Sequence, residues 1–136
     1  LYPRLKSALE RLGKNGARAV LWHQGESDTL AGTSADEYAK LLSNLIRQSR
    51  ADAGYEIPWM IASVSFIRAQ NEAKQPPIRE GQKKVCDGKS IFPGPDTDDM
   101  HGDYRAPDTV HFSGKGLQEH GQRWAAAMAK TLFADK

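Results

Sequence analysis

Residues 19–28, Ala-Val-Leu-Trp-His-Gln-Gly-Glu-Ser-Asp, join a short apolar run to a cluster of polar and acidic side chains. A continuous apolar run of this length is typical of a strand that is covered on both faces of a parallel sheet. Polar groups directly after such a strand serve either a turn or an active site. The rest of the sequence decides between these two interpretations.

The segments around this stretch predict alternating helices and strands. Apolar residues at helical spacing predict a helix from Tyr2 to Leu12, and the capping-box pattern of residues 34–37 begins a second helix. Further strands are predicted at 58–66 and 90–92, and further helices at 78–85 and after Ser113. Residues 93–107, rich in Asp, Gly and Pro, are expected to form a loop.

This alternation predicts an α/β protein with a parallel sheet and helices on both faces, a three-layer α/β/α arrangement. Ligands of such sheets bind outside the carboxyl ends of the strands. Residues 24–28 lie at one such end, which favours the active-site interpretation.

Composition narrows the class of protein further. The 136 residues suit one domain, residues 1–136, and 19 basic and 17 acidic residues give a formal charge of +2. Since no cluster of Lys and Arg lies beside aromatic residues and no apolar run reaches membrane-spanning length, we expect neither a nucleic-acid nor a membrane partner. Cys86 is the only cysteine, which excludes an internal disulfide and a multi-cysteine metal site, and we expect it to be a small buried apolar residue.

A second stretch, Asp108-Thr109-Val110-His111, precedes the last predicted helix. An Asp three residues before a His in a loop can place its carboxylate on the imidazole Nδ1–H, which stabilises the imidazolium that forms when Nε2 takes a proton. The imidazole then acts as a general base toward a hydroxyl nucleophile. The alternative is a loop in which Asp108 accepts from backbone donors and His111 only packs.

The two stretches together resemble the SGNH hydrolases, and more narrowly the sialate O-acetylesterase and carbohydrate esterase family 6 branch. The resemblance extends from about Val20 to Ala126. Four segments carry it: Trp-His-Gln-Gly-Glu-Ser-Asp at 22–28, Ile-Arg-Glu-Gly-Gln at 78–82, Asp-x-x-His at 108–111 and the helix entry at 111–123. The resemblance implies a flavodoxin-like sheet, an acetylated carbohydrate substrate and acyl transfer through a serine. It implies no metal and no organic cofactor, and it favours a secreted or periplasmic location.

The resemblance also assigns roles to individual residues. Gln24 matches the position whose side-chain amide contributes to the oxyanion hole, and His111 and Asp108 match the base and acid of the catalytic triad. Gly25 is expected to allow close backbone approach, and Glu26 to support the loop together with Ser27 and Asp28.

The sequence departs from the family pattern at the nucleophile. The family serine lies in a Gly-Gln-Ser-Asn-like block after the first strand, and none of the 23 residues before Gln24 resembles that block. We therefore expect the chain to be the C-terminal portion of an esterase domain that lacks one or more N-terminal strands. The nucleophile would then come from another polypeptide piece, and the sheet would carry an exposed apolar edge.

Three alternatives stay open. Ser27 could itself be the nucleophile, since Gly25-Glu26-Ser27 resembles the elbow of α/β-hydrolases, although Thr29 replaces the second glycine and the predicted helix begins only after Ser34. The chain could be a non-catalytic carbohydrate-binding or scaffold domain that keeps the esterase fold. It could also be an unrelated flavodoxin-like binding domain, which predicts that His111 lies far from Gln24.

Other polar residues are given structural roles. We expect His23 to pack at the strand end, His120 to be exposed, and Gly121 to pack closely against a neighbour. Trp22, Trp59, Leu117 and Trp124 are expected in the core. The loop that contains Asp96, Asp98, Asp99, His101 and Asp103 is expected to be solvated rather than to bind a metal, because its spacing does not fit an EF-hand.

Overall fold

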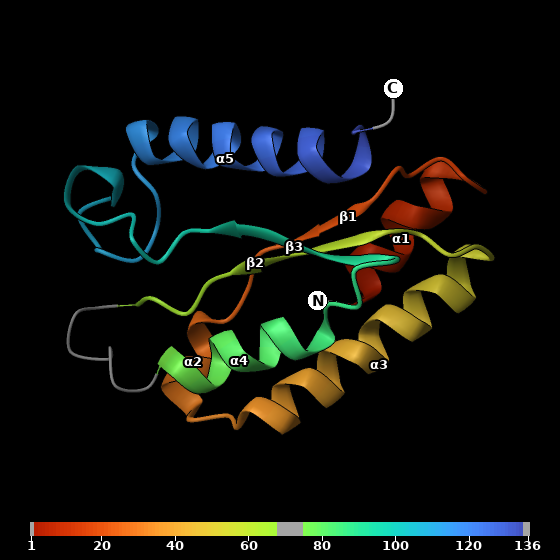
Figure 1. Ribbon diagram of the computed structural model, residues 1–136, viewed down its shortest axis with the longest axis horizontal. Coiled ribbons are helices and arrows are strands. Elements are labelled where there is room, and N and C mark those ends of the chain that lie inside the picture. Colours follow the sequence, from red (N-terminus) through yellow and green to blue (C-terminus); the bar gives the residue numbers. More distant parts are fainter. Residues whose placement is uncertain (1, 68–74, 135–136) are drawn as a thin grey trace.

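Three parallel strands form the central sheet in the order β1-β2-β3 (Figure 1). The computed structural model describes residues 2–67 and 75–134. Its elements in chain order are α1 (Tyr2–Leu12), β1 (Val20–Trp22), α2 (Glu26–Ala31), α3 (Ala35–Ala53), β2 (Trp59–Ser63), α4 (Gln75–Val85), β3 (Ile91–Asp96), the 3-10 turn η2 (Gly102–Tyr104) and α5 (Gly114–Leu132).

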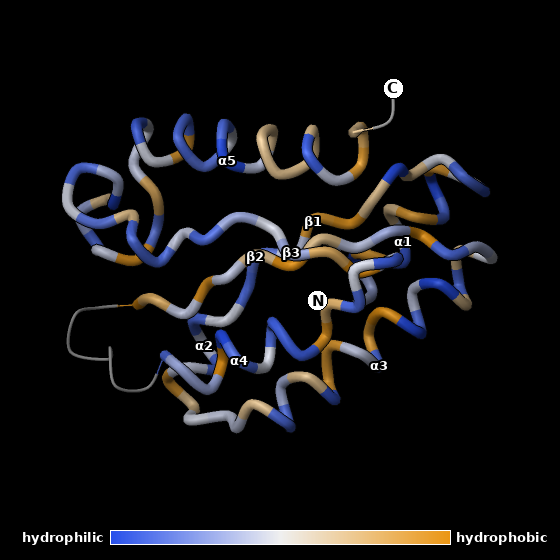
Figure 2. Tube along the Cα trace, in the orientation of Figure 1, coloured by the Kyte–Doolittle hydropathy of each residue, from blue (hydrophilic) through white to orange (hydrophobic). Residues whose placement is uncertain are grey.

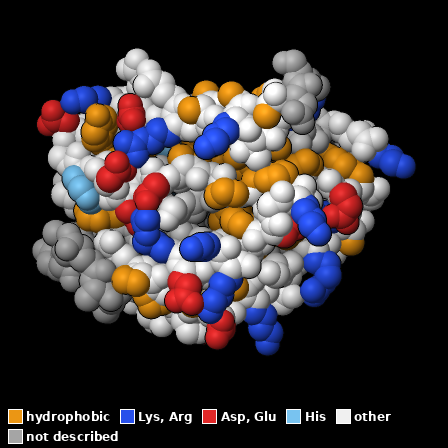
Figure 3. Space-filling view, viewed as in Figure 1, with side chains coloured by type: hydrophobic (Ala, Val, Ile, Leu, Met, Phe, Trp, Pro, Cys, Tyr) orange, Lys and Arg blue, Asp and Glu red, His pale blue; other side chains and the backbone are white. Residues whose placement is uncertain are grey.

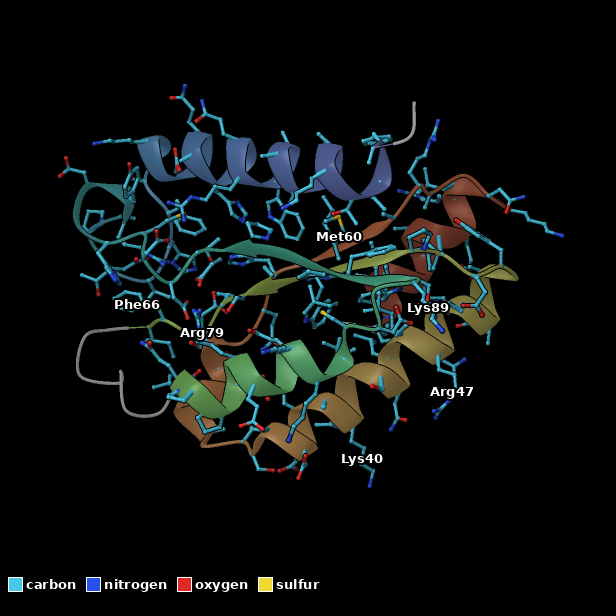
Figure 4. All side chains as sticks on the ribbon, in the orientation of Figure 1. Lys40, Arg47, Met60, Phe66, Arg79 and Lys89 are labelled. Atoms are coloured by element: carbon cyan, nitrogen blue, oxygen red, sulfur yellow. The ribbon has the colours of Figure 1, made fainter. Side chains whose placement is uncertain are left out.

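The middle strand is buried on both faces, as its continuous apolar sequence predicts. Trp59 and Ile61 face the larger core cluster, where they pack with side chains of α1, α3 and α4. Met60 and Ala62 face the opposite way, toward Trp124 of α5. Figure 4, in which Met60 is labelled, shows it on the side of the sheet that α5 covers.

The helices complete three layers around this sheet. Helix α5 covers one face, and α3 and α4 lie together over the other (Figure 1). Figure 2 shows hydrophobic and hydrophilic residues interspersed along α3, as expected of a helix with one buried side. The predicted α/β/α fold with a parallel sheet is therefore confirmed. No helix among residues 2–67 and 75–134 is long and apolar enough to span a membrane.

The predicted helix caps are also confirmed. The Ser34 hydroxyl accepts from the Glu37 amide at 3.2 Å, and the Ser113 hydroxyl accepts from the Gly116 amide at 3.1 Å. Each cap satisfies an amide at the start of a 19-residue helix. These caps fix where α3 and α5 begin, and therefore how the loops that precede them lie.

Several sequence expectations were wrong in detail. The expected loop at 93–107 contains the second half of β3 and η2, and β2 ends at Ser63 rather than at Phe66. Leu117, expected in the core, is 60% exposed. A Cβ on Gly121 would meet nothing within 4 Å, so this glycine does not mark a close helix contact. Cys86 is half-buried and packs against the larger core, as an apolar residue would.

The two edges of the sheet differ. The Trp59 amide donates to the Ser90 carbonyl, so the backbone groups of Ile91 and Pro93 point away from β2, up to the register shift that follows Pro93. The Ile91 amide donates to Asp87 Oδ1 at 2.8 Å, and Pro93 has no N–H to offer, so this part of the edge offers another strand no free donor. On β1, Leu21 is 42% exposed and carries no such block, which agrees with the expected apolar edge.

Candidate active site

Asp108 and His111 form the hydrogen-bonded pair that their spacing predicts. His111 Nδ1 lies 2.6 Å from Asp108 Oδ2, while Asp108 Oδ1 accepts from the amides of Val110 and His111, both at 2.9 Å. The hydrogen bonds from His111 and these amides lower the pKa of Asp108 to about 2. The hydrogen bond and charge of Asp108 in turn raise the pKa of His111. The carboxylate thus holds Nδ1 and leaves Nε2 for a reacting group.

The pair lies in a tight loop between η2 and α5. The amide of Ala106 donates to the carbonyl of His111 at 2.7 Å, and Thr109 takes a positive φ of 65° to close the turn between them. Arg105 and Phe112 form an isolated antiparallel bridge at the base of this loop. The imidazole itself is 82% exposed, so Nε2 is accessible from solvent.

One pocket joins this loop to the end of β1. It has a volume of about 440 Å³. Its lining residues come from both predicted stretches, namely His23, Glu26, Ser27, Arg105, Val110, His111, Phe112, Leu117 and His120. Sequence positions about 85 residues apart therefore meet at the carboxyl end of the sheet, where an α/β protein binds its ligands.

Gln24 lies beside this pocket without lining it. Its side-chain amide donates to Asp28 Oδ2 at 2.6 Å, and Asp28 Oδ1 also accepts from the Thr33 hydroxyl at 3.2 Å. The Gln24 carbonyl accepts from the Tyr38 hydroxyl at 2.6 Å and from Gln82 Nε2 at 3.1 Å. A primary amide has two N–H donors, and Asp28 takes one of them. No acceptor for the second is found among the described residues.

Gly25 is needed for close packing at this strand end. A Cβ at this position would lie 2.0 Å from the Val64 carbonyl oxygen and 2.7 Å from Gln82 Nε2. Glu26 Oε2 accepts from the Gly25 amide at 3.0 Å, so the carboxylate orders its own loop. Gln82 in turn bonds both backbone groups of Val64, and it thereby ties the ends of β1 and β2 together.

The acidic loop after β3 is not solvated throughout, which corrects the sequence expectation. Asp98 is 8% exposed and accepts from the amides of Ser65 and Phe66 and from the Ser65 hydroxyl. Arg79 bridges Asp98 and Asp96. Figure 4 shows Phe66 and Arg79, which are both labelled, at the same end of the molecule. Within the described ranges no group of three or more metal-binding side chains comes together.

His23 and His120 form an aromatic cluster at the floor of the pocket. Their rings lie 4.7 Å apart, and the Phe112 ring lies 4.8 Å from that of His120. The Trp124 Nε1–H donates to His120 Nε2 at 2.9 Å, and His23 Nε2 lies 3.1 Å from Thr97 Oγ1. The packed role expected for His23 agrees with this arrangement, whereas the expectation that His120 is exposed was wrong.

The half-buried His120 makes the stability of the protein depend on pH. Burial, and then the nearby His23 and Arg105, lower the pKa of His120 from 6.5 to about 4. Between these values the unfolded chain binds a proton that the folded chain does not, so stability falls as pH falls from 6.5 to about 4. His120→Gln cannot titrate and still offers Trp124 an acceptor. Between about pH 7 and pH 4.5, we expect the free energy of unfolding of this variant to fall less than that of the wild type. The difference should be about 1 kcal/mol or less, because the ring is partly exposed, and it should appear as a smaller fall in melting temperature. Parallel thermal melts at both pH values measure this, and equal pH slopes would contradict it.

Ser27 lies in a different context from the one its sequence suggested. The helix after β1 begins at Glu26, in the six-residue α2, rather than at the Ser34 cap. One argument against Ser27 as a nucleophile was that the next helix begins only after Ser34, and this argument is therefore wrong. No hydrogen bond joins Ser27 to His111 in the part of the chain that the structure describes, although both line the same pocket.

Taken together, the fold and the pocket define an α/β protein with an Asp–His pair at the carboxyl end of a parallel sheet. A family model described as "Carbohydrate esterase, sialic acid-specific acetylesterase" matches residues 1–130, and the chain belongs to this family of carbohydrate esterases. No curated protein and no solved structure matches the chain.

Some residues of the site are not marked as functional by any pattern in the sequence. Tyr38 lay in an apolar helical stripe, but its hydroxyl holds the Gln24 carbonyl. Thr97 and Arg105 lay in a segment expected to be an irregular loop, yet they are 0% and 9% exposed. Gln82 could have been found, because it lies in the Arg-Glu-x-Gln segment that carries part of the resemblance.

Proposed function

We propose that the protein hydrolyses O-acetyl esters on carbohydrate through a serine acetyl-enzyme. The observation that supports this most directly is the 2.6 Å contact between His111 Nδ1 and Asp108 Oδ2 in a pocket shared with the loop after β1. In this proposal His111 is the general base and acid, Asp108 orients it, and Gln24 donates to the oxyanion. Gly25 and Glu26 support the Gln24 loop.

The proposed reaction has two acyl-transfer steps. The serine oxygen attacks the ester carbonyl while His111 Nε2 takes its proton, and the oxyanion accepts from the second Gln24 N–H. Collapse of the tetrahedral intermediate transfers that proton to the departing sugar oxygen and leaves an acetyl-serine. Water then attacks with the same base, which releases acetate and returns the proton to the serine.

We further propose that the serine lies on polypeptide other than residues 1–136, on a strand that pairs with β1. No hydrogen bond occupies the backbone of Leu21 at that edge among the described residues, whereas Asp87 and Pro93 leave the first part of the β3 edge without a free donor. A strand added beside β1 would end next to the pocket that His111 and Ser27 line. The exposed face of His111 agrees with a partner group that arrives from outside the described residues.

The proposed substrate is an acetylated sugar, with xylan and sialic acid as the two candidates to compare. The family description names sialic acid, and the proposal that this chain recognises a glycan is supported by its family membership alone. Figure 3 shows acidic and basic side chains interspersed over one face of the molecule, so no single-sign surface on that face favours a polyanion. Acetate release from both acetylated sugars distinguishes the candidates.

A fluorophosphonate probe tests the function and the position of the nucleophile together. Residues 1–136 alone, and the same residues expressed with the coding region that precedes them, are treated with the probe and mapped by mass spectrometry. We expect one labelled serine, only in the longer protein, with turnover of p-nitrophenyl acetate in the same sample. Labelling of Ser27 in residues 1–136 would move the nucleophile into this chain, and sugar binding without labelling or turnover would favour a non-catalytic binding domain.

A further inference from the structure

Arg105 is the buried cation of the site, and within the described ranges no carboxylate forms an ion pair with it, although the charges of Asp98 and Glu26 act on it from farther away. Its side chain lies beneath the loop that carries His111 and is 9% exposed. None of the ion pairs in the described part of the chain includes it. Burial lowers the pKa of Arg105, which shows that the site disfavours its charge. A cation retained at such a cost needs a role that a neutral side chain would not fill.

The guanidinium donates hydrogen bonds to three backbone carbonyls. Nε donates to Met100 O at 2.6 Å, Nη1 to Val110 O at 2.7 Å and Nη2 to Thr97 O at 3.1 Å. Its Cζ atom also lies over two aromatic rings, 5.0 Å from the Phe66 centroid and 4.5 Å from the Phe112 centroid. A planar fork with fixed donor directions makes these contacts together, and a lysine ammonium cannot.

These contacts hold both neighbours of His111. Val110, which precedes it, is held through its carbonyl, and Phe112, which follows it, is held through its ring and through the backbone bridge to Arg105. The other two hydrogen bonds of the guanidinium go to the carbonyls of Met100 and Thr97, two fully buried residues that follow β3. The loop that carries the base is therefore anchored to the sheet through one side chain.

We propose that Arg105 is a positioning residue that fixes His111 against Asp108 and toward the pocket. The proposal deepens the proposed function and rests on it for its catalytic meaning, but the geometry that it predicts can be measured without turnover. Without the guanidinium, the segment from Ala106 to Phe112 would keep its backbone bridge but lose its side-chain anchors on both sides of His111, and the Asp108–His111 contact would become intermittent.

The test is the titration of each histidine by NMR in the full-length protein, with Arg105→Lys and Arg105→Met beside the wild type. Asp108 raises the pKa of His111, so we expect the His111 pKa to fall toward its ordinary 6.5 in both variants. Arg105 lowers the pKa of His120, so the His120 pKa should rise in Arg105→Met but stay low in Arg105→Lys, which keeps the charge. Opposite shifts of the two histidines separate lost positioning from lost charge.

A matched control is available at the other end of the sheet. Arg50 also donates to backbone carbonyls, those of Ile57 and Ser90, and its replacement by methionine should leave the His111 pKa unchanged. In the full-length protein we expect kcat/KM of Arg105→Lys to fall by about 10–100-fold, as expected when a catalytic group is misplaced by about 1 Å. If Arg105→Met does not fold, Arg105→Lys and Phe112→Leu carry the same test.

Each outcome bears on one claim. An unchanged His111 pKa in Arg105→Lys and Phe112→Leu would overturn the positioning role, and the esterase proposal would still stand if His111→Ala were inactive. A fall in the His111 pKa in a protein whose His111→Ala variant stays active would support the positioning role and remove the proposed function instead. A fall of the same size in Arg50→Met would show a general loss of structure and would overturn the specific role of Arg105.

Discussion

We expect replacement of His111 with alanine to abolish the proposed ester hydrolysis and to leave the fold unchanged. The imidazole is the base and acid in both proposed acyl-transfer steps, and loss of a catalytic histidine of this kind costs about 10⁶ in kcat. The side chain is 82% exposed, so its removal should leave the melting temperature close to that of the wild type. Initial rates with p-nitrophenyl acetate, together with thermal melts, measure both quantities in the full-length protein.

A neighbouring histidine supplies the control. His101 is exposed in the adjacent loop, where its ring packs on Phe66, and His101→Ala should keep most of the activity. The rate requires neutral His111, and Asp108 raises the His111 pKa, so the acidic limb of kcat/KM should lie above pH 6.5. Asp108→Asn should lower the rate and move this limb down toward 6.5. Activity that survives His111→Ala, after contaminating esterases are excluded, would remove His111 from the mechanism.

The fold could be predicted from the sequence because each signal was local. The apolar run at 19–22, the caps at Ser34 and Ser113 and the helical stripes each depend on neighbours a few residues away, and the α/β order follows from their sequence. The boundaries that failed depend on distant partners. β3 continues through Pro93 to Asp96 because Pro93 faces the outer edge, where no amide is needed, and a register shift follows it, which the letters alone do not show.

The candidate site divides in the same way. The Asp108–His111 contact is local, and its spacing predicts it. The buried state of Asp98 and Arg105 is not local, since Asp98 is satisfied by Ser65 and Phe66, and Arg105 is satisfied by carbonyls and two rings from separate segments. His120 looked exposed because it lies off the apolar stripe of its helix, and the rings of His23 and Phe112, which come from other segments, partly cover it. The roles of Gln24, Asp108 and His111 in catalysis stay predictions.

Gln24→Ala is expected to lower kcat by about 10²–10³ while the protein stays folded, because removal of one oxyanion donor has this effect in acyl-transfer enzymes. The same change removes the hydrogen bond to Asp28, which should cost the fold about 1–2 kcal/mol. The carbonyl of Gln24, which Tyr38 and Gln82 hold, is part of the backbone and is kept in the variant. Steady-state kinetics and chemical denaturation of the same preparation compare the two losses.

Thr33→Val is the matched control for this comparison. It removes the other donor to Asp28, at 3.2 Å, and so disturbs the same carboxylate without touching the Gln24 amide. If Gln24 acts on the reacting oxygen, Thr33→Val should lower stability by a similar amount, with kcat within about threefold of the wild type. Asp28→Asn keeps an acceptor for Gln24 but loses the charge, so it should lie between the two variants in kcat. A kcat that follows stability equally in all three would mean that Gln24 only braces the strand end, and the oxyanion donor would then have to be sought among other groups at the pocket.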